Sequence, residues 1–198
     1  MHSIKAFYDH HPQTTIVLVL HPDYIDQWPE ICSEHKFTIP HSIVAGGETR
    51  FHSVWNALQF IRNDKVFSAD EDPLIAIHDG VRPLVTSRII EDGYQTALRS
   101  GSAIPAVRST DSVRVIGADE TSSVIDRNKV VLIQTPQTFR SSVLQKAYEQ
   151  EYDPAFTDDA SVIEKSGYPV HIIEGDIRNI KVTFPVDLVI ADKLIEQD

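Results

Sequence analysis

Residues 74–83 read LIAIHDGVRP, an apolar run of four residues that continues directly into charged ones. Consecutive apolar residues without polar alternation are typical of a parallel strand that is covered on both faces. A carboxylate and an arginine that follow such a strand lie at its carboxyl end, where open α/β sheets bind their ligands. The stretch therefore predicts an α/β fold with a site that contains Asp79 and Arg82.

The segments on either side continue this alternation of strand and helix. Before the stretch, residues 16–20 form a second apolar run, and residues 51–62 carry apolar side chains at helical spacing. After it we expect a helix over residues 86–98, with a capping threonine at its start and Gly101 at its end, and then a strand over residues 102–107. Such alternation predicts an open, mainly parallel sheet with helices on both faces.

Residues 108–132 differ in character from the rest of the chain. Valines and isoleucines are interspersed there with polar residues, and a Gly-Ala-Asp-Glu turn interrupts them at residues 117–120. This pattern predicts a polar hairpin that projects from the main body as an arm. We interpret residues 1–198 as a single domain. The remaining expected elements are helices over residues 142–150, 158–165 and 185–195 and strands over residues 171–174 and 179–183.

The charge and the cysteine content exclude several classes of protein. The chain has 18 Lys and Arg against 29 Asp and Glu, a formal net charge of −11, and such a surface repels nucleic acid. The single cysteine, Cys32, rules out an internal disulfide and a cysteine-based zinc site. The chain has no apolar run long enough to cross a bilayer, and its first residues lack the pattern of a secretory signal. We therefore expect a cytoplasmic protein without membrane or nucleic-acid partners.

Two segments offer groups that could bind a phosphorylated ligand. Residues 45–50 read AGGETR, and the two glycines allow backbone N–H groups to approach a ligand, while Arg50 and Ser53 share one helix face. An ordinary strand-to-helix turn would show the same pattern. At the second segment, Asp79 could hold Mg²⁺ or accept a hydroxyl hydrogen bond, and Arg82 could bind phosphate oxygens. The alternative is an Asp79–Arg82 ion pair that only ties down the loop.

Four more residues allow a functional and a plain interpretation. Thr135 follows an apolar run and could offer its hydroxyl to a phosphate, whereas Thr157 is by local rules a helix cap. Lys181 lies in a predicted strand, where a lysine either blocks edge-to-edge aggregation or points into the cleft to neutralise a phosphate. Arg127, in the arm, is either solvated or completes the site of another subunit. The sequence contains no dinucleotide-binding, P-loop, zinc-protease or serine-hydrolase fingerprint.

Taken in order, these segments resemble the 2-C-methyl-D-erythritol 4-phosphate cytidylyltransferase family of non-mevalonate isoprenoid biosynthesis. Each segment is weak alone, but six in register form a specific signal that covers essentially the whole chain. The segments are Gly46-Gly47 with Arg50 and Ser53, His78-Asp79 with Arg82-Pro83, Asp126-Arg127-Asn128, Thr135-Pro136-Gln137, Thr157-Asp158 with Ala160-Ser161, and Asn179-Ile180-Lys181-Val182-Thr183.

The resemblance implies a Rossmann-like nucleotidyltransferase that forms a homodimer through its arm. The implied reaction transfers a cytidylyl group from CTP to 2-C-methyl-D-erythritol 4-phosphate with the help of Mg²⁺ or another divalent cation. The resemblance implies that Gly46, Gly47 and Ser53 contact the cytidine and that Asp79 and Arg82 lie on the side of the sugar phosphate and the metal. It implies that Arg127 reaches the substrate phosphate in the partner's site and that Thr110, Thr135 and Thr157 hold the substrate. The implied role of Lys181 is to position the substrate and to stabilise charge.

The start of the chain departs from the family pattern. The family begins with a strand and a Gly-rich loop that grips the triphosphate, whereas residues 1–7 here resemble the helix that follows that unit. We therefore expect that one βα unit, about 30 to 40 residues, is absent and that two strands lack a neighbour between them. Two alternative functions stay open: a ribitol 5-phosphate cytidylyltransferase, and a truncated, non-catalytic protein that binds a phosphosugar.

Overall fold

The computed structural model describes residues 1–63, 67 and 71–196. The strands are β1 (Val17–Leu20), β2 (Ser42–Ala45), β3 (Leu74–Ile77), β4 (Ser102–Arg108), β5 (Val113–Ile116), β6 (Ser122–Ile125), β7 (Val131–Ile133), β8 (Gln137–Arg140) and β9 (Ile172–Glu174). The helices are α1 (His2–His10), α2 (Pro22–Ile25), α3 (Trp28–Glu34), α4 (Arg50–Asn63), α5 (Ser87–Ser100), the short 3₁₀ turn η1 (Arg127–Lys129), α6 (Ser141–Ala147), α7 (Asp159–Lys165) and α8 (Pro185–Ile195).

The central sheet has the strand order β3-β8-β4-β7, and β9 also pairs with β4. Because β8 runs antiparallel to both β3 and β4, and β9 runs parallel to β4, the strands β3, β4 and β9 share one direction. Strands β1 and β2 form a separate parallel pair. The expected Rossmann-like α/β class, with most strands in parallel orientation, is confirmed. Strand β8, which lies between β3 and β4, and strand β7 run in the opposite direction.

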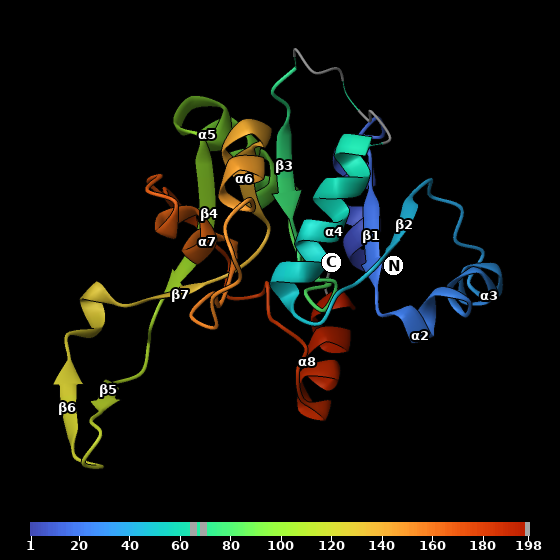
Figure 1. Cartoon of the computed structure of the whole chain (residues 1–198). Helices are drawn as coiled ribbons and strands as arrows, with labels where there is room; N and C mark the ends of the chain where they lie inside the picture. Colours follow the sequence, from blue (N-terminus) through green and yellow to red (C-terminus); the bar gives the residue numbers. More distant parts are fainter. Residues whose placement is uncertain (64–66, 68–70, 197–198) are drawn as a thin grey trace.

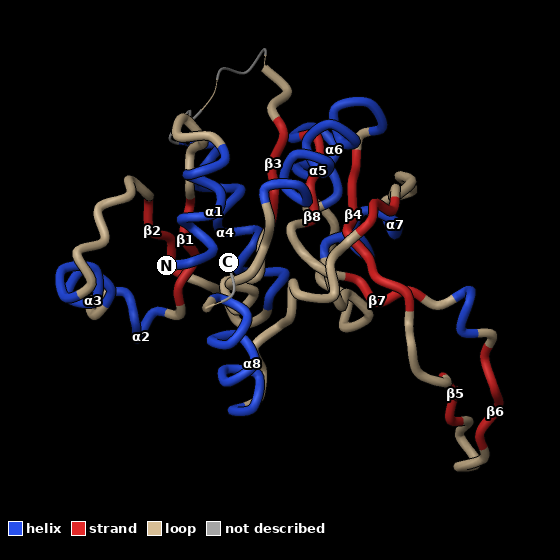
Figure 2. Tube along the Cα trace, turned by 180° about the vertical axis from the view of Figure 1, so that it is seen from behind, coloured by secondary structure: helices blue, strands red, loops and turns tan. Residues whose placement is uncertain are grey.

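Helices cover both faces of these sheets (Figure 1, Figure 2). On the face with α4, α6 and α7, the side chains of Phe51, Phe139 and Leu144 belong to one buried apolar cluster. On the other face, Ile89 and Ile90 of α5 pack with residues of α1 in a second cluster. Each such large side chain contributes about 1.5–3 kcal/mol when it is fully buried, so these two clusters fix the layers.

Local capping signals account for several of the helix ends. The Thr86 side chain accepts a hydrogen bond from the Ile89 backbone N–H at the start of α5, and Gly101 ends that helix with a φ of 87°, as expected. At α7 the expectation was wrong: Asp158, not Thr157, is the N-cap, and its side chain accepts from the Ser161 N–H. Helix α6 was expected over residues 142–150 but ends at Ala147.

Two expectations about strands were also wrong. Residues 179–183 form an extended loop and not a strand, held to the loop after β3 by the hydrogen bond from Val182 N–H to the Val81 carbonyl, 2.8 Å. Strand β8 was not expected, because Gln137 and Thr138 look like loop residues, yet both are buried in the middle of the sheet. The Gln137 side chain makes its hydrogen bonds with residues outside the sheet. Its amide N–H donates to Asp158 at 2.8 Å, and its amide oxygen accepts from the Ala160 N–H at 2.8 Å.

Residues between β4 and β7 leave the main body as a long hairpin (Figure 1). Strands β5 and β6 pair antiparallel at its end, with Val113 opposite Ile125. Two of its apolar side chains, Ile116 and Val124, are 74% and 72% exposed. This hairpin is therefore not packed against the sheet from which it projects.

A cavity of about 990 Å³ lies between β1 and β3. Both strands line it, together with α1, α4 and residues 78–81. Within residues 1–63, 67 and 71–196, β1 pairs only with β2 and β3 only with β8, so each strand turns one unpaired edge toward the cavity. No helix in these described ranges combines the length and the apolar character needed to span a bilayer.

Candidate active site

The candidate site is centred on Asp79, two residues after the end of β3. Three cations surround its carboxylate: Lys181 Nζ at 3.2 Å, Arg50 Nε at 3.4 Å and Arg82 Nε at 3.7 Å. The Asp79 side chain is only 14% exposed. Burial alone would raise the pKa of this carboxyl, but Arg50, Lys181 and Arg82 hold its pKa below the usual range. Asp79 is therefore ionised, and its single negative charge is surrounded by the three positive charges of Lys181, Arg50 and Arg82.

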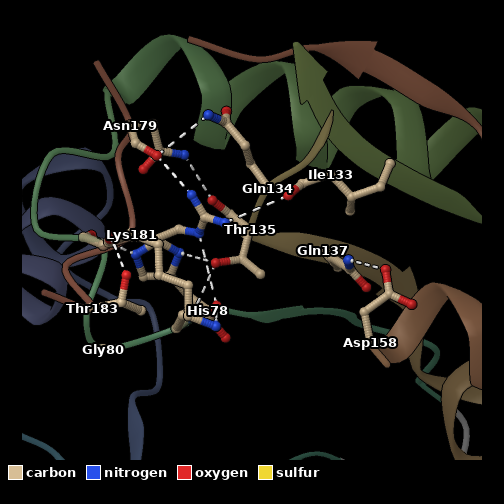
Figure 3. Close-up of polar contacts among 12 residues, drawn as sticks. His78, Gly80, Ile133, Gln134, Thr135, Gln137, Asp158, Asn179, Lys181 and Thr183 are labelled. Atoms are coloured by element: carbon tan, nitrogen blue, oxygen red, sulfur yellow. Dashed lines mark hydrogen bonds and ion pairs between the residues drawn. The ribbon is translucent and has the colours of Figure 1, made fainter. Parts of the chain in front are cut away.

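The loop that carries Asp79 is fixed by a chain of hydrogen bonds (Figure 3). The Thr135 hydroxyl accepts from the Asp79 backbone N–H at 3.0 Å and lies 3.1 Å from His78 Nδ1. His78 Nε2 lies 2.9 Å from the Arg82 carbonyl oxygen. One proton arrangement satisfies all three contacts: Nε2–H donates to the carbonyl, and Nδ1 accepts from Thr135. Burial lowers the pKa of His78 to about 4, so the ring is neutral as this arrangement requires.

A second set of hydrogen bonds brings Lys181 to the same place. Asn179 is fully buried, its side-chain N–H donates to the Thr135 carbonyl at 2.9 Å, and its own carbonyl accepts from Arg82 at 2.8 Å. The side chain of Gln134 donates to the Asp176 carbonyl at 2.8 Å. Three distant segments of the chain, namely the end of β3, the β7–β8 junction and residues 176–181, thus meet at one point (Figure 3).

The structure gives Thr135 and Lys181 contacts that differ from the expected ones. Thr135 is 4% exposed, and its hydroxyl binds the Asp79 loop instead of facing solvent where a phosphate could approach. Lys181 was expected inside a strand, but it lies on an extended loop, its side chain is 46% exposed, and it is paired with Asp79. The interpretation as an edge-strand lysine is therefore wrong. The expected Asp79–Arg82 ion pair exists, together with the Arg82–Asn179 hydrogen bond.

The glycine turn lies beside this cluster at the start of α4. The Gly47 N–H donates to the Ser53 hydroxyl at 3.1 Å, and a Cβ at Gly47 would lie 2.4 Å from Cβ of His52, so no side chain fits there. At Gly46 a Cβ would lie 3.1 Å from the Ser53 Oγ. Ser53 and Arg50 both line the cavity between β1 and β3, as do Asp79 and Lys181. The two glycines therefore adjoin the cationic cluster.

Two of the other expected site residues belong to the arm and not to the cluster around Asp79. Arg127 and Thr110 are exposed residues of the arm, and Arg127 donates to the Thr110 carbonyl at 3.1 Å. The arm extends away from β3, which carries the Asp79 loop (Figure 1). Thr157 is exposed just before α7. One chain thus brings together Asp79, Arg82 and Lys181, but not the two arm residues.

The sequence reasoning missed two buried groups that reach the site through Arg50. The Arg50 guanidinium donates two hydrogen bonds to Asp159, at 2.8 and 2.6 Å, and the Tyr148 hydroxyl donates to the same carboxylate at 2.6 Å. Burial alone would lower the pKa of Arg50, but Asp159 and Asp79 raise it. The only signal in the sequence was the acidic pair Asp158-Asp159, of which one residue caps α7 and the other is buried.

The described residues contain no group of three or more His, Cys, Asp or Glu side chains that could hold a metal ion. A single carboxylate such as Asp79 nevertheless fits a Mg²⁺ ion that is also held by substrate phosphates, since Mg²⁺ often takes one or two carboxylates and completes its shell with phosphate and water. The three cations around Asp79 disfavour a free divalent cation there. Asp79 and its neighbours therefore fit a Mg²⁺ ion that binds together with the phosphate groups of a substrate.

Comparisons with known proteins assign the chain to a family. The family model for 2-C-methyl-D-erythritol 4-phosphate cytidylyltransferase matches residues 1–197. Proteins of that name from Bacteroides thetaiotaomicron and Porphyromonas gingivalis are 41% and 43% identical to this chain over 98% of its length, which corresponds to 85% and 83% of theirs.

Solved structures agree with this assignment. The 2-C-methyl-D-erythritol 4-phosphate cytidylyltransferase from Thermus thermophilus has a TM-score of 0.76 and 28% identity, with 98% of this chain and 87% of that chain covered. The 4-diphosphocytidyl-2C-methyl-D-erythritol synthase from Anaerococcus prevotii has a TM-score of 0.82 and 25% identity, with the same coverage. The expected resemblance is confirmed, and the chain belongs to the 2-C-methyl-D-erythritol 4-phosphate cytidylyltransferase family.

Proposed function

We propose that this chain transfers a cytidylyl group from CTP to 2-C-methyl-D-erythritol 4-phosphate, giving 4-diphosphocytidyl-2-C-methyl-D-erythritol and pyrophosphate. The proposal is supported by the family membership and by one observation above all. Lys181 and Arg82 converge on Asp79 at the carboxyl end of β3, so a local excess of positive charge exists in a chain whose net charge is −11. A polyanionic substrate would bind at such a place.

The chemistry of the reaction matches these groups. A phosphate oxygen of the methylerythritol phosphate attacks the α-phosphorus of CTP, and the bond to the β-phosphate oxygen breaks as pyrophosphate leaves. Both reactants are polyanions, so most of the catalysis comes from positioning and charge neutralisation. Lys181 has an exposed, flexible side chain and can move from Asp79 to a phosphate, whereas Arg82 is held by Asn179. No covalent nucleophile is required.

A divalent cation, Mg²⁺ in our proposal, would be held by Asp79 together with substrate phosphates. It would supply further neutralisation of the phosphate charge. The proposed cytidine contacts are Gly46, Gly47 and Ser53. Ser53 lines the same cavity as Arg50, and its hydroxyl accepts a hydrogen bond from the Gly47 N–H. Thr157 is proposed to contact the sugar phosphate from the start of α7.

The arm supports a proposal about assembly. Its apolar side chains Ile116 and Val124 are exposed, and the arm, to which Arg127 belongs, extends away from β3 of the same chain (Figure 1). We propose that two chains form a homodimer through their arms, and that Arg127 and Thr110 act at the substrate phosphate in the partner's site. A site shared in this way needs a closed, twofold arrangement, which is the commonest form of oligomer.

The test is pyrophosphate release from CTP with methylerythritol phosphate as the acceptor, compared with ribitol 5-phosphate. We expect turnover with the first acceptor, and turnover with ribitol 5-phosphate alone would overturn the substrate assignment. Lys181→Ala should lower kcat/KM by about 100-fold, the order of effect of one lost charge-stabilising donor. Lys193→Ala is the matched control, because Lys193 is an exposed lysine paired with Glu196 on α8.

The second candidate is a non-catalytic protein that binds a phosphosugar. It is favoured by the cavity of about 990 Å³ that lies between β1 and β3 next to the cationic cluster. Because no described strand fills the space between β1 and β3, the site is open on that side. Calorimetric titration distinguishes the two candidates. Binding of methylerythritol phosphate without any pyrophosphate release would support this second function.

A further inference from the structure

Arg50 joins the site carboxylate to a buried carboxylate on another helix. Its two terminal nitrogens donate to the two oxygens of Asp159, at 2.8 and 2.6 Å, and its Nε lies 3.4 Å from Oδ1 of Asp79. A guanidinium is planar and presents its donors at fixed angles. Because Asp159 holds both terminal nitrogens, the direction of the Nε–H bond is fixed as well.

Asp159 is itself held in place. It is fully buried, and the Tyr148 hydroxyl donates to its Oδ1 at 2.6 Å. The Tyr148 ring stacks on Phe51, the residue after Arg50, with ring centroids 4.7 Å apart. Charge-assisted hydrogen bonds of this kind are shorter and stronger than neutral ones. The Arg50 side chain is 35% exposed, but its guanidinium is therefore held by a carboxylate that is fixed in the core.

The two oxygens of Asp79 have different kinds of partner. Oδ1 faces the anchored Arg50, whereas Oδ2 faces Lys181 at 3.2 Å and Arg82 at 3.7 Å. Lys181 is 46% exposed and sits on an extended loop, so its ammonium can leave Asp79 when a phosphate arrives. Arg50 cannot leave without breaking its pair with Asp159. When Lys181 moves, Oδ2 keeps only Arg82 at 3.7 Å, which is too far for a hydrogen bond, whereas Oδ1 keeps the hydrogen bond from Arg50.

We propose that Arg50 is a positioning residue, anchored by Asp159 and Tyr148, which fixes the Asp79 carboxylate so that Oδ2 is the oxygen presented to substrate or to its divalent cation. Arg50 acts through Asp79 and does not itself contact the reacting atoms. The inference rests on the proposed function only for the identity of the substrate or cation that Asp79 binds. The anchoring itself can be tested without catalysis.

The first experiment observes the Arg50 Nε–H group by ¹H–¹⁵N NMR of the full chain, with the resonance assigned by its loss in Arg50→Lys. We expect this proton to exchange with solvent about tenfold more slowly than that of Arg62, an exposed arginine on the same helix, since its hydrogen bonds must open first. Asp79→Asn should shift the resonance, and Tyr148→Phe or Asp159→Asn should accelerate its exchange. A resonance that exchanges like Arg62 and does not respond to Asp79→Asn would overturn the inference.

The second experiment measures kinetics in a variant that keeps the core intact. Tyr148→Phe retains the ring that stacks on Phe51 and removes only the hydroxyl that binds Asp159. We expect kcat to fall about fivefold with the KM for CTP within about twofold, since a misplaced Asp79 affects the transition state more than nucleotide binding. Tyr152→Phe is the control, because Tyr152 lies in the same aromatic cluster and is 40% exposed.

The outcomes separate the inference from the proposed function. If Tyr148→Phe matches the Tyr152→Phe control in kcat, the positioning role is wrong even though the enzyme is active. If Arg50→Lys retains full activity, a positive charge suffices and the fixed geometry is not needed, which also contradicts the inference. If the unmodified chain has no turnover, the proposed function fails, while the NMR experiment still decides whether Arg50 is anchored on Asp79.

Discussion

The Thr135 hydroxyl accepts a hydrogen bond from the backbone N–H of Asp79 at 3.0 Å, although 56 positions separate the two residues in the sequence. The same oxygen lies 3.1 Å from His78, so one buried threonine joins the β7–β8 junction to the loop that carries the site carboxylate. The position of Asp79 thus depends on a side chain from a different part of the sheet.

Thr135→Val should destabilise the protein by about 1–3 kcal/mol, because the Asp79 N–H then stays buried without an acceptor. Valine has nearly the shape of threonine, so packing changes little. Urea unfolding measures the effect, and Thr135→Ser, which keeps the hydroxyl, serves as the control. A Thr135→Val protein as stable as the Thr135→Ser protein would show that this hydrogen bond contributes nothing to stability.

The neutral His78 makes stability depend on pH. Burial lowers its pKa from 6.5 to about 4 in the folded protein, so between these values the unfolded chain binds a proton that the folded chain does not. The free energy of unfolding therefore falls as the pH falls through this window, by up to about 3 kcal/mol from this residue. Below pH 4 the contribution stays constant.

Other groups also titrate in this range, so the prediction concerns the difference between two proteins. His78→Gln removes the titration at this position. Its stability deficit relative to the unmodified chain should be largest near pH 7 and shrink as the pH falls to 4, as measured by urea unfolding at each pH. A deficit that is independent of pH would contradict the prediction.

The cap of α7 gives a prediction in which two neighbouring residues act as test and control. Asp158→Ala removes the N-cap of α7 and the acceptor of the buried Gln137 side chain, so we expect a loss of about 2 kcal/mol. Thr157→Ala should leave stability within about 0.5 kcal/mol, because Thr157 is exposed and is not the cap. Thermal unfolding of the two variants compares them directly, and a reversed order would disprove the assignment of the cap.

The proposed shared site predicts complementation between inactive variants. Arg127→Ala and Asp79→Asn should each be nearly inactive alone. After the subunits are mixed and exchanged, half of the dimers contain one of each, and one of their two sites is intact, so about one quarter of the full activity should return. Arg114→Ala, on the arm strand β5, replaces Arg127→Ala in the control mixture. No recovery after verified subunit exchange would exclude an arm that works across the dimer.

Sequence reasoning succeeded where the cause of a structure lies within a few residues. The apolar run before His78 predicts β3, and Thr86 with Gly101 predicts both ends of α5. It failed at β8, because Gln137 is acceptable in a central strand only through partners on α7. It missed Asp159 for the same reason, since the residue that neutralises this buried carboxylate lies 109 positions away.

The same distinction applies to the candidate site. Asp79 and Arg82 were predicted from their position after a strand, and the structure pairs them as the plain interpretation expected. Lys181 was named for its charge, but its loop is shaped by Asn179 and by Val182, whose contacts are with the β7–β8 junction and the Asp79 loop. Which residues meet at the site follows from the topology, and the sequence around each residue does not contain that information.

The separation of β1 and β2 from the central sheet has a consequence for the dynamics of the molecule. Among the described residues no hydrogen-bonded strand joins this pair to β3, and it packs mainly against α4. Strand β4, by contrast, is flanked by three other strands and is largely buried. The β1–β2 pair can therefore open as a unit of its own, and its backbone amides should exchange with deuterium at a lower free energy than those of β4. Because Gly46 and Gly47 follow β2 directly, the proposed nucleotide-contacting turn sits on the less protected of the two units, and a bound nucleotide would slow exchange there first.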